Sequence, residues 1–363
     1  MSRARDFADL AGSADAGGIS GSNVIINGAF QISQRGTSTT GGGFLVDRFE
    51  LNINNTDNIA ITQSQDSSGP SGFANSWKIL ATTAESAVAA DERVRFRQNI
   101  EGQNLQQFAF GTSAAKSMTL SFYVKSNKTG TYAVNLEQDD ASRVIGSTYT
   151  ISSADTWEFK TITVGGDTSG TINDDNGAGL VVSWYLLAGS NYTATDNTSY
   201  GASADGKQAY GHSTTWGQGT NDNFFITGVQ LELGEQATPF EHRSFADELA
   251  RCQRYYWQLS TGVHGNYPSW AATGYNTNQC NINLPFPVPM RTVPTASFNT
   301  GNVNYYRFYR GGGNENFGNV ATDTISSEHL NMYGDGISHT QGLNGTLQIR
   351  LADGAGVFVT AEL

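Results

Sequence analysis

The chain has 363 residues, enough for two or three domains that each bury a hydrophobic core. Only 15% of the residues are charged, and 33 Asp and Glu against 21 Lys and Arg give a formal net charge of −12. A nucleic-acid binder needs clustered basic residues that displace counterions from phosphates, so this composition excludes nucleic acid as a partner.

The chain also lacks the apolar segments of a membrane protein. No run of about 18 apolar residues occurs, and the N-terminus has no apolar core of the signal-peptide type. We therefore expect no membrane insertion, and a protein that is soluble when made and assembled in the cytoplasm. The two cysteines, Cys252 and Cys280, form neither a disulfide framework nor a metal site, so we expect two free buried thiols.

Glycine is the outlier of the composition, with 42 residues, well above the average share of roughly 7%. Asn, Thr and Ser are also frequent, and all four residue types favour turns. Many turns imply many short strands, so the composition predicts a mainly β protein.

Residues 1–22 open with a short amphipathic piece and then consist of small residues such as Ala, Gly and Ser. Such residues bury too little surface to fold alone. We predict an N-terminal docking arm whose contacts come from Arg3, Arg5, Phe7 and Leu10. The alternative is a terminal tail that has no role.

Short apolar segments with period-two alternation follow, separated by turns. The expected strands are 24–26, 44–53, 76–81, 93–97, 118–125, 131–138, 157–164, 180–187 and 224–233. Nine or ten strands at this spacing predict that residues 23–243 form an antiparallel jelly-roll β-sandwich.

A helix and a second β-domain are expected after the sandwich. Residues 245–259 have apolar residues at helical spacing, with acidic residues near the start and basic ones near the end, so we predict a connecting helix within 244–260. Short strands return over 303–309, 329–333, 347–351 and 357–361, which predicts a smaller C-terminal β-domain over 261–363.

The sequence has no constellation typical of a catalyst. The five histidines are scattered, and there is neither a G-x-S-x-G motif nor a phosphate-binding loop. The pairs Asp139-Asp140 and Asp174-Asp175 offer oxygen ligands for calcium, although paired loop aspartates are ordinarily solvated. A glycosidase pair leaves no trace in spacing. We expect no enzyme, no catalytic residue and no metal ligand.

Aromatic side chains are the other candidates for a site. Exposed rings stack on the apolar faces of sugars, while amides and carboxylates take the hydroxyls. The candidates are Tyr123, Tyr185, Trp157 and Trp216. The alternative for each ring is packing in the core. Because Tyr123 and Tyr185 alternate with apolar neighbours, we expect these two to point away from the core.

Several segments resemble a family of bacteriophage tail-fibre and receptor-binding proteins. They are Asn27-Gly28-Ala29-Phe30, Gln34-Arg35-Gly36-Thr37, Val46-Asp47-Arg48-Phe49, Ile100-Glu101-Gly102-Gln103-Asn104, residues 120–126 with Gly130-Thr131-Tyr132, residues 230–243, residues 289–295 and Ala361-Glu362-Leu363. Residues 2–10 resemble the virion-attaching start of the same family. The segments occur in the family's order and span nearly the whole chain.

This resemblance implies a jelly roll similar to carbohydrate-binding modules. Modules of this type often hold a structural calcium ion, and the corresponding positions here are Gln31 and Gln230. Amides are weaker calcium ligands than carboxylates, so we expect no cofactor, with calcium as the alternative.

The resemblance also implies a structural virion protein, a tail fibre or related appendage, assembled in the host cytoplasm. The protein would form a homo-oligomer, a trimer as in the appendages of the family. Its other partners would be virion proteins of the tail or near the portal, and host-surface polysaccharide. The alternatives are a decoration, head-fibre or connector protein with no host ligand, and a polysaccharide depolymerase. Phage depolymerases commonly use β-helices with short repeats, and the sequence has no such period.

Overall fold

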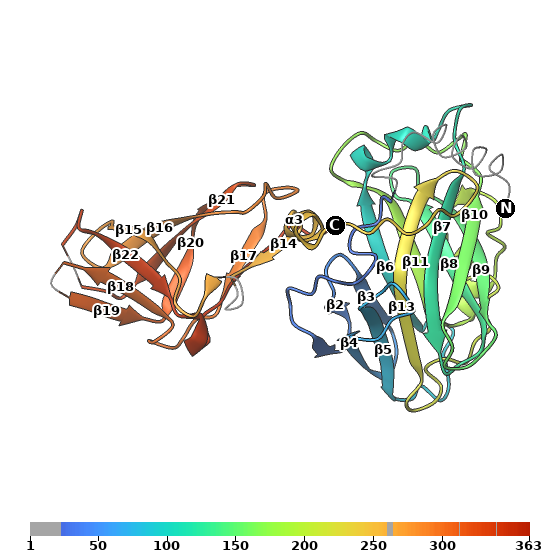
Figure 1. Ribbon diagram of the computed structural model, residues 1–363, viewed down its shortest axis with the longest axis horizontal. Helices are drawn as coiled ribbons and strands as arrows, with labels where there is room; N and C mark the ends of the chain where they lie inside the picture. The colour runs from blue at the N-terminus through green and yellow to red at the C-terminus, as the bar shows by residue number, and fades with distance from the viewer. Residues whose placement is uncertain (1–22, 260–263, 312, 339) are drawn as a thin grey trace. The chain divides into compact units, whose positions relative to one another are not determined.

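The computed structural model describes residues 23–259, 264–311, 313–338 and 340–363 (Figure 1). The predicted docking residues Arg3, Arg5, Phe7 and Leu10 lie outside these ranges. The chain divides into two compact units, Met1–Glu248 with Leu363, and Leu249–Glu362. In the described ranges every strand pairing is antiparallel, so the prediction of a mainly β fold is confirmed.

The first unit is the predicted jelly-roll sandwich of two sheets, with the strand orders β1-β4-β5-β13-β7-β10 and β12-β9-β8-β11-β6-β3-β2 (Figure 1). The strands are β1 Ser38–Thr40, β2 Gly43–Phe44, β3 Glu50–Asn54, β4 Ala60–Asp66, β5 Ser76–Thr83, β6 Arg93–Glu101, β7 Met118–Ser126, β8 Gly130–Gln138, β9 Arg143–Ile151, β10 Glu158–Val164, β11 Ala178–Ala188, β12 Gly201–Ala202 and β13 Asn223–Leu233. Short helical turns join them, namely η1 Gly102–Asn104, η2 Gln106–Phe108, α2 Ser190–Thr193 and η3 Asp205–Lys207.

Large aromatic rings fill the space between the two sheets. Period-two alternation sends every second side chain of each strand inward, where Trp77, Phe96 and Trp184 are fully buried. The rings of Phe96 and Trp184 stack, with centroids 5.2 Å apart. Trp216 also lies in this core with 0% exposure. The prediction that places Trp216 at a surface site is therefore wrong, because its ring contributes to the apolar packing that holds the sheets together.

Helix α3, Phe245–Gln253, begins at the predicted residue but ends before residue 259. Residues Tyr256–Gln258 instead form strand β14, which pairs with β23. A backbone that forms these ladder hydrogen bonds is extended and cannot be helical, so the predicted C-terminal end of the helix is wrong. None of the helices in the described residues is long and apolar enough to cross a membrane.

The second unit has its own core between a three-stranded sheet, β14-β23-β17, and a seven-stranded sheet, β19-β18-β22-β15-β16-β21-β20. The strands are β15 Ser269–Gly274, β16 Gln279–Pro285, β17 Thr295–Phe298, β18 Tyr306–Arg310, β19 Gly313–Phe317, β20 Asn319–Ile325, β21 His329–Asp335, β22 Asn344–Ile349 and β23 Val357–Thr360, with a turn η4 Leu351–Asp353. Cys252 and Cys280 are buried thiols, as predicted, and neither takes part in a disulfide.

One histidine of the first unit is held in its neutral form. His212 follows η3, and its Nδ1 accepts the backbone N–H of Ala133 at 3.3 Å. Its Nε2 is shielded from solvent. Burial of the ring lowers the pKa of His212 from 6.5 to about 4, because the charged imidazolium would lose its hydration.

We predict that His212 makes the protein acid-sensitive. The unfolded chain takes up a proton near pH 6.5 and the folded chain only near pH 4, so this stabilisation is complete above pH 6.5 and is lost as the pH falls toward 4. His212→Gln should remove up to about 3 kcal/mol of the pH dependence of unfolding between these values. Denaturant titrations at pH 7.5 and 4.5 measure it, with exposed His242→Gln as the control. Equal pH dependence in all three proteins would contradict the prediction.

Candidate functional site

The outer face of the six-stranded sheet carries a strip of aromatic rings. Val124 and Ile226 belong to the hydrophobic core, so their neighbours along β7 and β13 point outward. Tyr123 pairs with Phe159 across β7 and β10, and their ring centroids are 4.8 Å apart. Phe159 is 48% exposed. The predicted outward orientation of Tyr123 is confirmed, and its ring is half-buried beside Phe159.

Three further rings extend this strip from outside the strands. The ring of Phe73 lies 5.5 Å from that of Tyr123, 5.0 Å from that of Phe240 and 5.2 Å from that of His242. Gly228 of β13 lies directly beneath, with a φ of +63°, and a Cβ there would lie 2.8 Å from Phe73 Cζ. Only glycine permits both this conformation and this close approach. We call Phe73, Tyr123, Phe159, Phe240 and His242 the aromatic strip.

A second row of side chains crosses the same face, two residues farther along each strand. Lys78, Phe225 and Lys125 are register partners on β5, β13 and β7. Lys125 Nζ lies 4.2 Å from the ring centroid of Phe225 and 5.1 Å from that of Trp157. Lys78 Nζ lies 5.4 Å from the Phe225 centroid. We call Lys78, Phe225, Lys125 and Trp157 the lysine row, and the strip and row together the aromatic face.

The aromatic face can bind a flat ligand with one apolar side. Rings on a rigid sheet lose little conformational entropy on binding, and they offer their faces to the C–H groups of a sugar. Phe159 and Tyr123 form an open surface, while the half-buried Trp157 and the two ammonium groups lie beside it. The structure thus brings together two predicted residues, Tyr123 and Trp157.

Tyr185 lies on the other sheet and is buried, so the prediction that it is exposed is wrong. Period two does turn its side chain to the outer face of β11, but the ring packs there with Tyr192 and Ala209 and is 0% exposed. Its hydroxyl accepts hydrogen bonds from Asn135 Nδ2 at 3.0 Å and from Arg95 Nη1 at 3.4 Å. The segment after β11 therefore covers this face.

Sequence reasoning missed most of the aromatic face. Phe159 had a signal, because it alternates with Ile162 and Val164 and so must point outward from β10. Lys78 and Lys125 had the same signal within their strands. Phe73 and Phe240 come from loops, where no period indicates the direction of a side chain.

One aspartate of each pair binds loop backbone. The carboxylate of Asp140 accepts hydrogen bonds from the backbone N–H of Asn173 at 3.0 Å and from the side-chain Nδ2 of Asn173 at 2.7 Å. The carboxylate of Asp175 accepts the backbone N–H of Gly177 at 2.8 Å. Within the ranges that the structure describes, no three His, Cys, Asp or Glu residues lie close enough to hold a metal ion.

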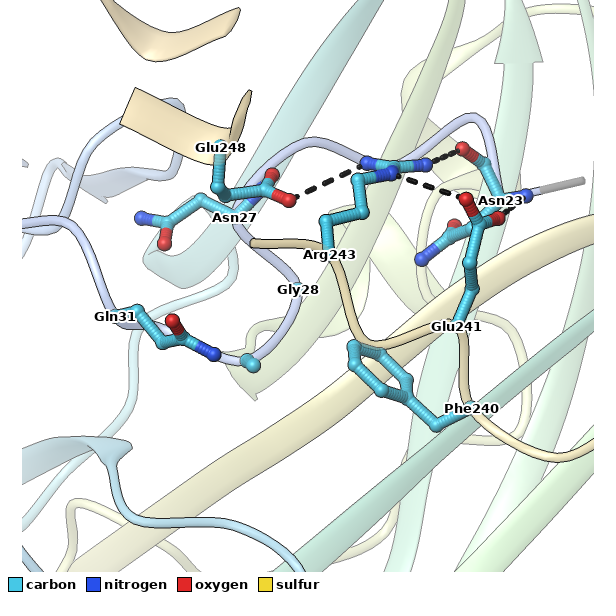
Figure 2. A pocket seen from close by; sticks show the side chains of 9 residues that line it. Asn23, Asn27, Gly28, Gln31, Phe240, Glu241, Arg243 and Glu248 are labelled. Atoms are coloured by element: carbon cyan, nitrogen blue, oxygen red, sulfur yellow. Dashed lines mark hydrogen bonds and ion pairs between the residues drawn. The ribbon is translucent and has the colours of Figure 1, made fainter. Parts of the chain in front are cut away.

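A separate pocket of the first unit surrounds the guanidinium of Arg243 (Figure 2). Its Nη1 donates to the carbonyl oxygen of Ile25 at 3.0 Å and lies 3.5 Å from Glu248 Oε2. Its Nη2 donates to the carbonyl oxygen of Asn23, and its Nε lies 3.3 Å from Glu241 Oε1. Figure 2 shows the carboxylate of Glu248 on one side of the guanidinium and the oxygen atoms of Asn23 and Glu241 on the other. The side chain of Arg243 is 7% exposed.

The implied calcium ligands do not fit a metal site. Gln230 is buried, its Nε2 donates to Glu232 Oε1 at 2.9 Å, and its Oε1 accepts the N–H of Glu241 at 2.9 Å. Gln31 lines the Arg243 pocket. The carbonyl and carboxylate oxygens that converge in this pocket already surround a cation of the chain, the guanidinium of Arg243.

Comparisons with known proteins give jelly-roll neighbours of low similarity. No protein-family model matches the chain, and no curated protein matches it. Similar solved structures include the enzymatically active domain of bacteriophage CBA120 tailspike protein 4, at 14% identity over 58% of this chain and 21% of that chain, with a TM-score of 0.31. This chain therefore matches about a fifth of the tailspike chain.

Two other neighbours are carbohydrate-binding modules. One is TmCBM61 in complex with β-1,4-galactotriose, at 9% identity over 60% of this chain and 100% of that chain, with a TM-score of 0.29. The other is the CBM22-1 xylan-binding domain of Paenibacillus barcinonensis Xyn10C, at 9% identity over 60% and 97%, with a TM-score of 0.28. Membership of a phage tail-fibre family stays a prediction from the sequence.

We predict that Arg243, and not calcium, stabilises the first unit. Arg243→Ala removes the guanidinium that pairs with Glu241 and Glu248, and should lower the free energy of unfolding by about 3 kcal/mol. Denaturant unfolding measures this, with Arg251→Ala, an exposed arginine of α3, as the control. The unaltered protein should unfold at the same temperature in EDTA and in millimolar calcium. A clear loss of stability in EDTA would contradict the assignment.

Proposed function

We propose that this protein is a non-enzymatic phage virion protein, a tail fibre or related appendage, whose aromatic face binds a glycan of the host surface. The observation that carries the glycan part is the aromatic face, with Tyr123 and Phe159 at its open end. The virion part is supported by the sequence segments that resemble tail-fibre proteins.

The outer face of a sandwich sheet normally carries polar side chains, because it meets water. Here the aromatic strip and the two rings of the lysine row lie on it instead, and Phe159 remains half exposed. Leaving apolar rings in water loses the free energy that their burial would release, about 25 cal/mol for each Å² of apolar surface. A ligand that stacks on the rings recovers this free energy, which is the physical reason to propose a site here.

A homotrimer would present three such faces on one appendage. Shallow sites on an open sheet bind one glycan chain weakly, since only one side of the sugar is covered. Three sites that engage one cell surface raise the overall affinity without any new contact. The proposed oligomer therefore compensates for the openness of the aromatic face.

We predict that Tyr123→Ala and Phe159→Ala each weaken glycan binding about tenfold, the effect of losing roughly 1.4 kcal/mol of stacking. The purified full chain is first applied to an array of bacterial surface glycans, and the glycan that binds is then titrated by calorimetry. Tyr210→Ala is the matched control, because Tyr210 is an exposed ring of the same unit outside the aromatic face.

Two results would count against this proposal. An intact oligomer that binds no glycan would instead fit a virion connector without a host ligand. A Phe159→Ala protein that falls apart into monomers in analytical ultracentrifugation would show that the aromatic face contacts another copy of the chain.

For the N-terminal segment we predict a role in assembly alone. Deletion of residues 1–22 should abolish incorporation into phage particles, because the proposed docking residues Arg3, Arg5, Phe7 and Leu10 are removed. The remaining chain should fold and oligomerise as before. Immunoblots of purified particles measure incorporation, and circular dichroism with ultracentrifugation measures folding and assembly. A truncated protein that fails to fold would refute a pure docking role.

A further inference from the structure

We propose that the ligand of the aromatic face is an acidic glycan, whose carboxylate groups meet the ammonium groups of Lys78 and Lys125. This inference rests on the proposed function and specifies its ligand. It starts from the lysine row, where the chain places two cations beside rings that can stack on sugars.

The two lysines lie on opposite sides of one ring. Lys78 and Lys125 flank Phe225 on adjacent strands, so their backbones are about 10 Å apart, two strand spacings. Both residues are half-buried. Each ammonium group lies over the Phe225 ring, and the attraction between the cation and the ring favours this position. Their positive charge therefore lies at a defined place on the aromatic face.

Neither ammonium group has a carboxylate partner within 4 Å among the residues that the structure describes. The contrast with other lysines of the same unit is clear, because Lys128 pairs with Asp222 at 3.2 Å and Lys160 with Glu158 at 2.5 Å. The chain has 33 Asp and Glu residues, so carboxylates that could pair with a lysine are abundant in the sequence. The lysine row therefore combines aromatic rings with two positive charges that no acidic side chain of the described ranges pairs.

An acidic sugar fits this combination better than a neutral one. Its ring offers an apolar face to Tyr123 or Trp157, and its carboxylate accepts hydrogen bonds from an ammonium group. A neutral sugar accepts hydrogen bonds from the ammonium groups only at its hydroxyls and forms no ion pair with them. With a net charge of −12, the protein as a whole repels a polyanion, so the attraction must come from cations at the site itself.

The competing explanation is that the lysine stems only shield Phe225, which is 8% exposed. Methionine distinguishes the two, because it keeps an unbranched apolar side chain over the ring and removes the charge. The variants are Lys78→Met, Lys125→Met and the double substitution. Lys116→Met is the control, since it removes one exposed charge from the same unit outside the aromatic face.

The experiment uses an array that pairs each uronic-acid or sialic-acid glycan with its carboxyl-reduced form. We expect the unaltered full chain to bind acidic members and to lose their signal on carboxyl reduction. The double variant should bind the best acidic member of the array about tenfold more weakly, because it loses two solvent-accessible ion pairs with the carboxylates of the ligand. Lys116→Met should leave affinity unchanged, and binding should weaken as salt rises from 50 to 500 mM. Thermal unfolding verifies that each variant is folded.

Other outcomes would overturn the inference in distinguishable ways. Equal binding to acidic and reduced glycans, unaffected by the double substitution, would leave glycan binding intact and show that the ligand is neutral. Equal weakening toward both forms would show that the lysines only position Phe225. No binding to any glycan would overturn the proposed function itself.

Discussion

Strand β13 changes register against β7 between Thr227 and Gln230, and Gly228 adopts a left-handed conformation within this bulge. Bulges bend a strand and change the direction of its side chains. On the outer face, the missing Cβ of Gly228 lets the rings of Phe73 and Tyr123 close over the backbone. The aromatic strip depends on this one irregularity.

The same bulge makes room for the opening segment of the sandwich. Before the bulge, β13 pairs with β5. After the bulge, β13 bonds to the opening segment: the N–H of Val24 donates to Leu231 O at 3.0 Å, and the N–H of Val229 donates to Gly28 O at 2.9 Å. The segment from Asn23 thus lies along the second half of β13, which brings its carbonyl oxygens to Arg243. A fixed bulge therefore positions both the aromatic strip and the Arg243 pocket.

A guanidinium belongs to the chain, whereas a metal ion must be captured from solution. A bound ion stabilises a fold only in proportion to the logarithm of its free concentration over its dissociation constant. Arg243 gives the same positive charge at any calcium concentration, and its planar donors match two carbonyl oxygens and two carboxylates. The burial of this charge is offset by Glu241 and Glu248, so no external ion is required.

Period two in the sequence predicted most of the sandwich strands, because each buries one face, and it gave the correct direction for Tyr123 and Tyr185. It could not show what covers an outer face. The segment with Tyr192 and Ala209 buries Tyr185, and Trp216 enters the core from a turn that has no period. The helix ended early for a similar reason, since the pairing of β14 with β23 joins residues about 100 apart in sequence. Phe73 and Phe240 meet only in the folded chain.

The net charge of the chain likewise does not predict the charge of one local site. A net charge of −12 describes a long-range average, and salt screens such a field beyond about 8 Å at physiological ionic strength. Lys78 and Lys125 lie within contact distance of the Phe225 ring, so a ligand on the aromatic face meets them before it meets the distant carboxylates. An acidic protein can therefore carry a local site for an acidic ligand. The distant negative charge then acts mainly on the approach of the ligand, where it slows association, while the local cations and rings determine how long a bound sugar stays.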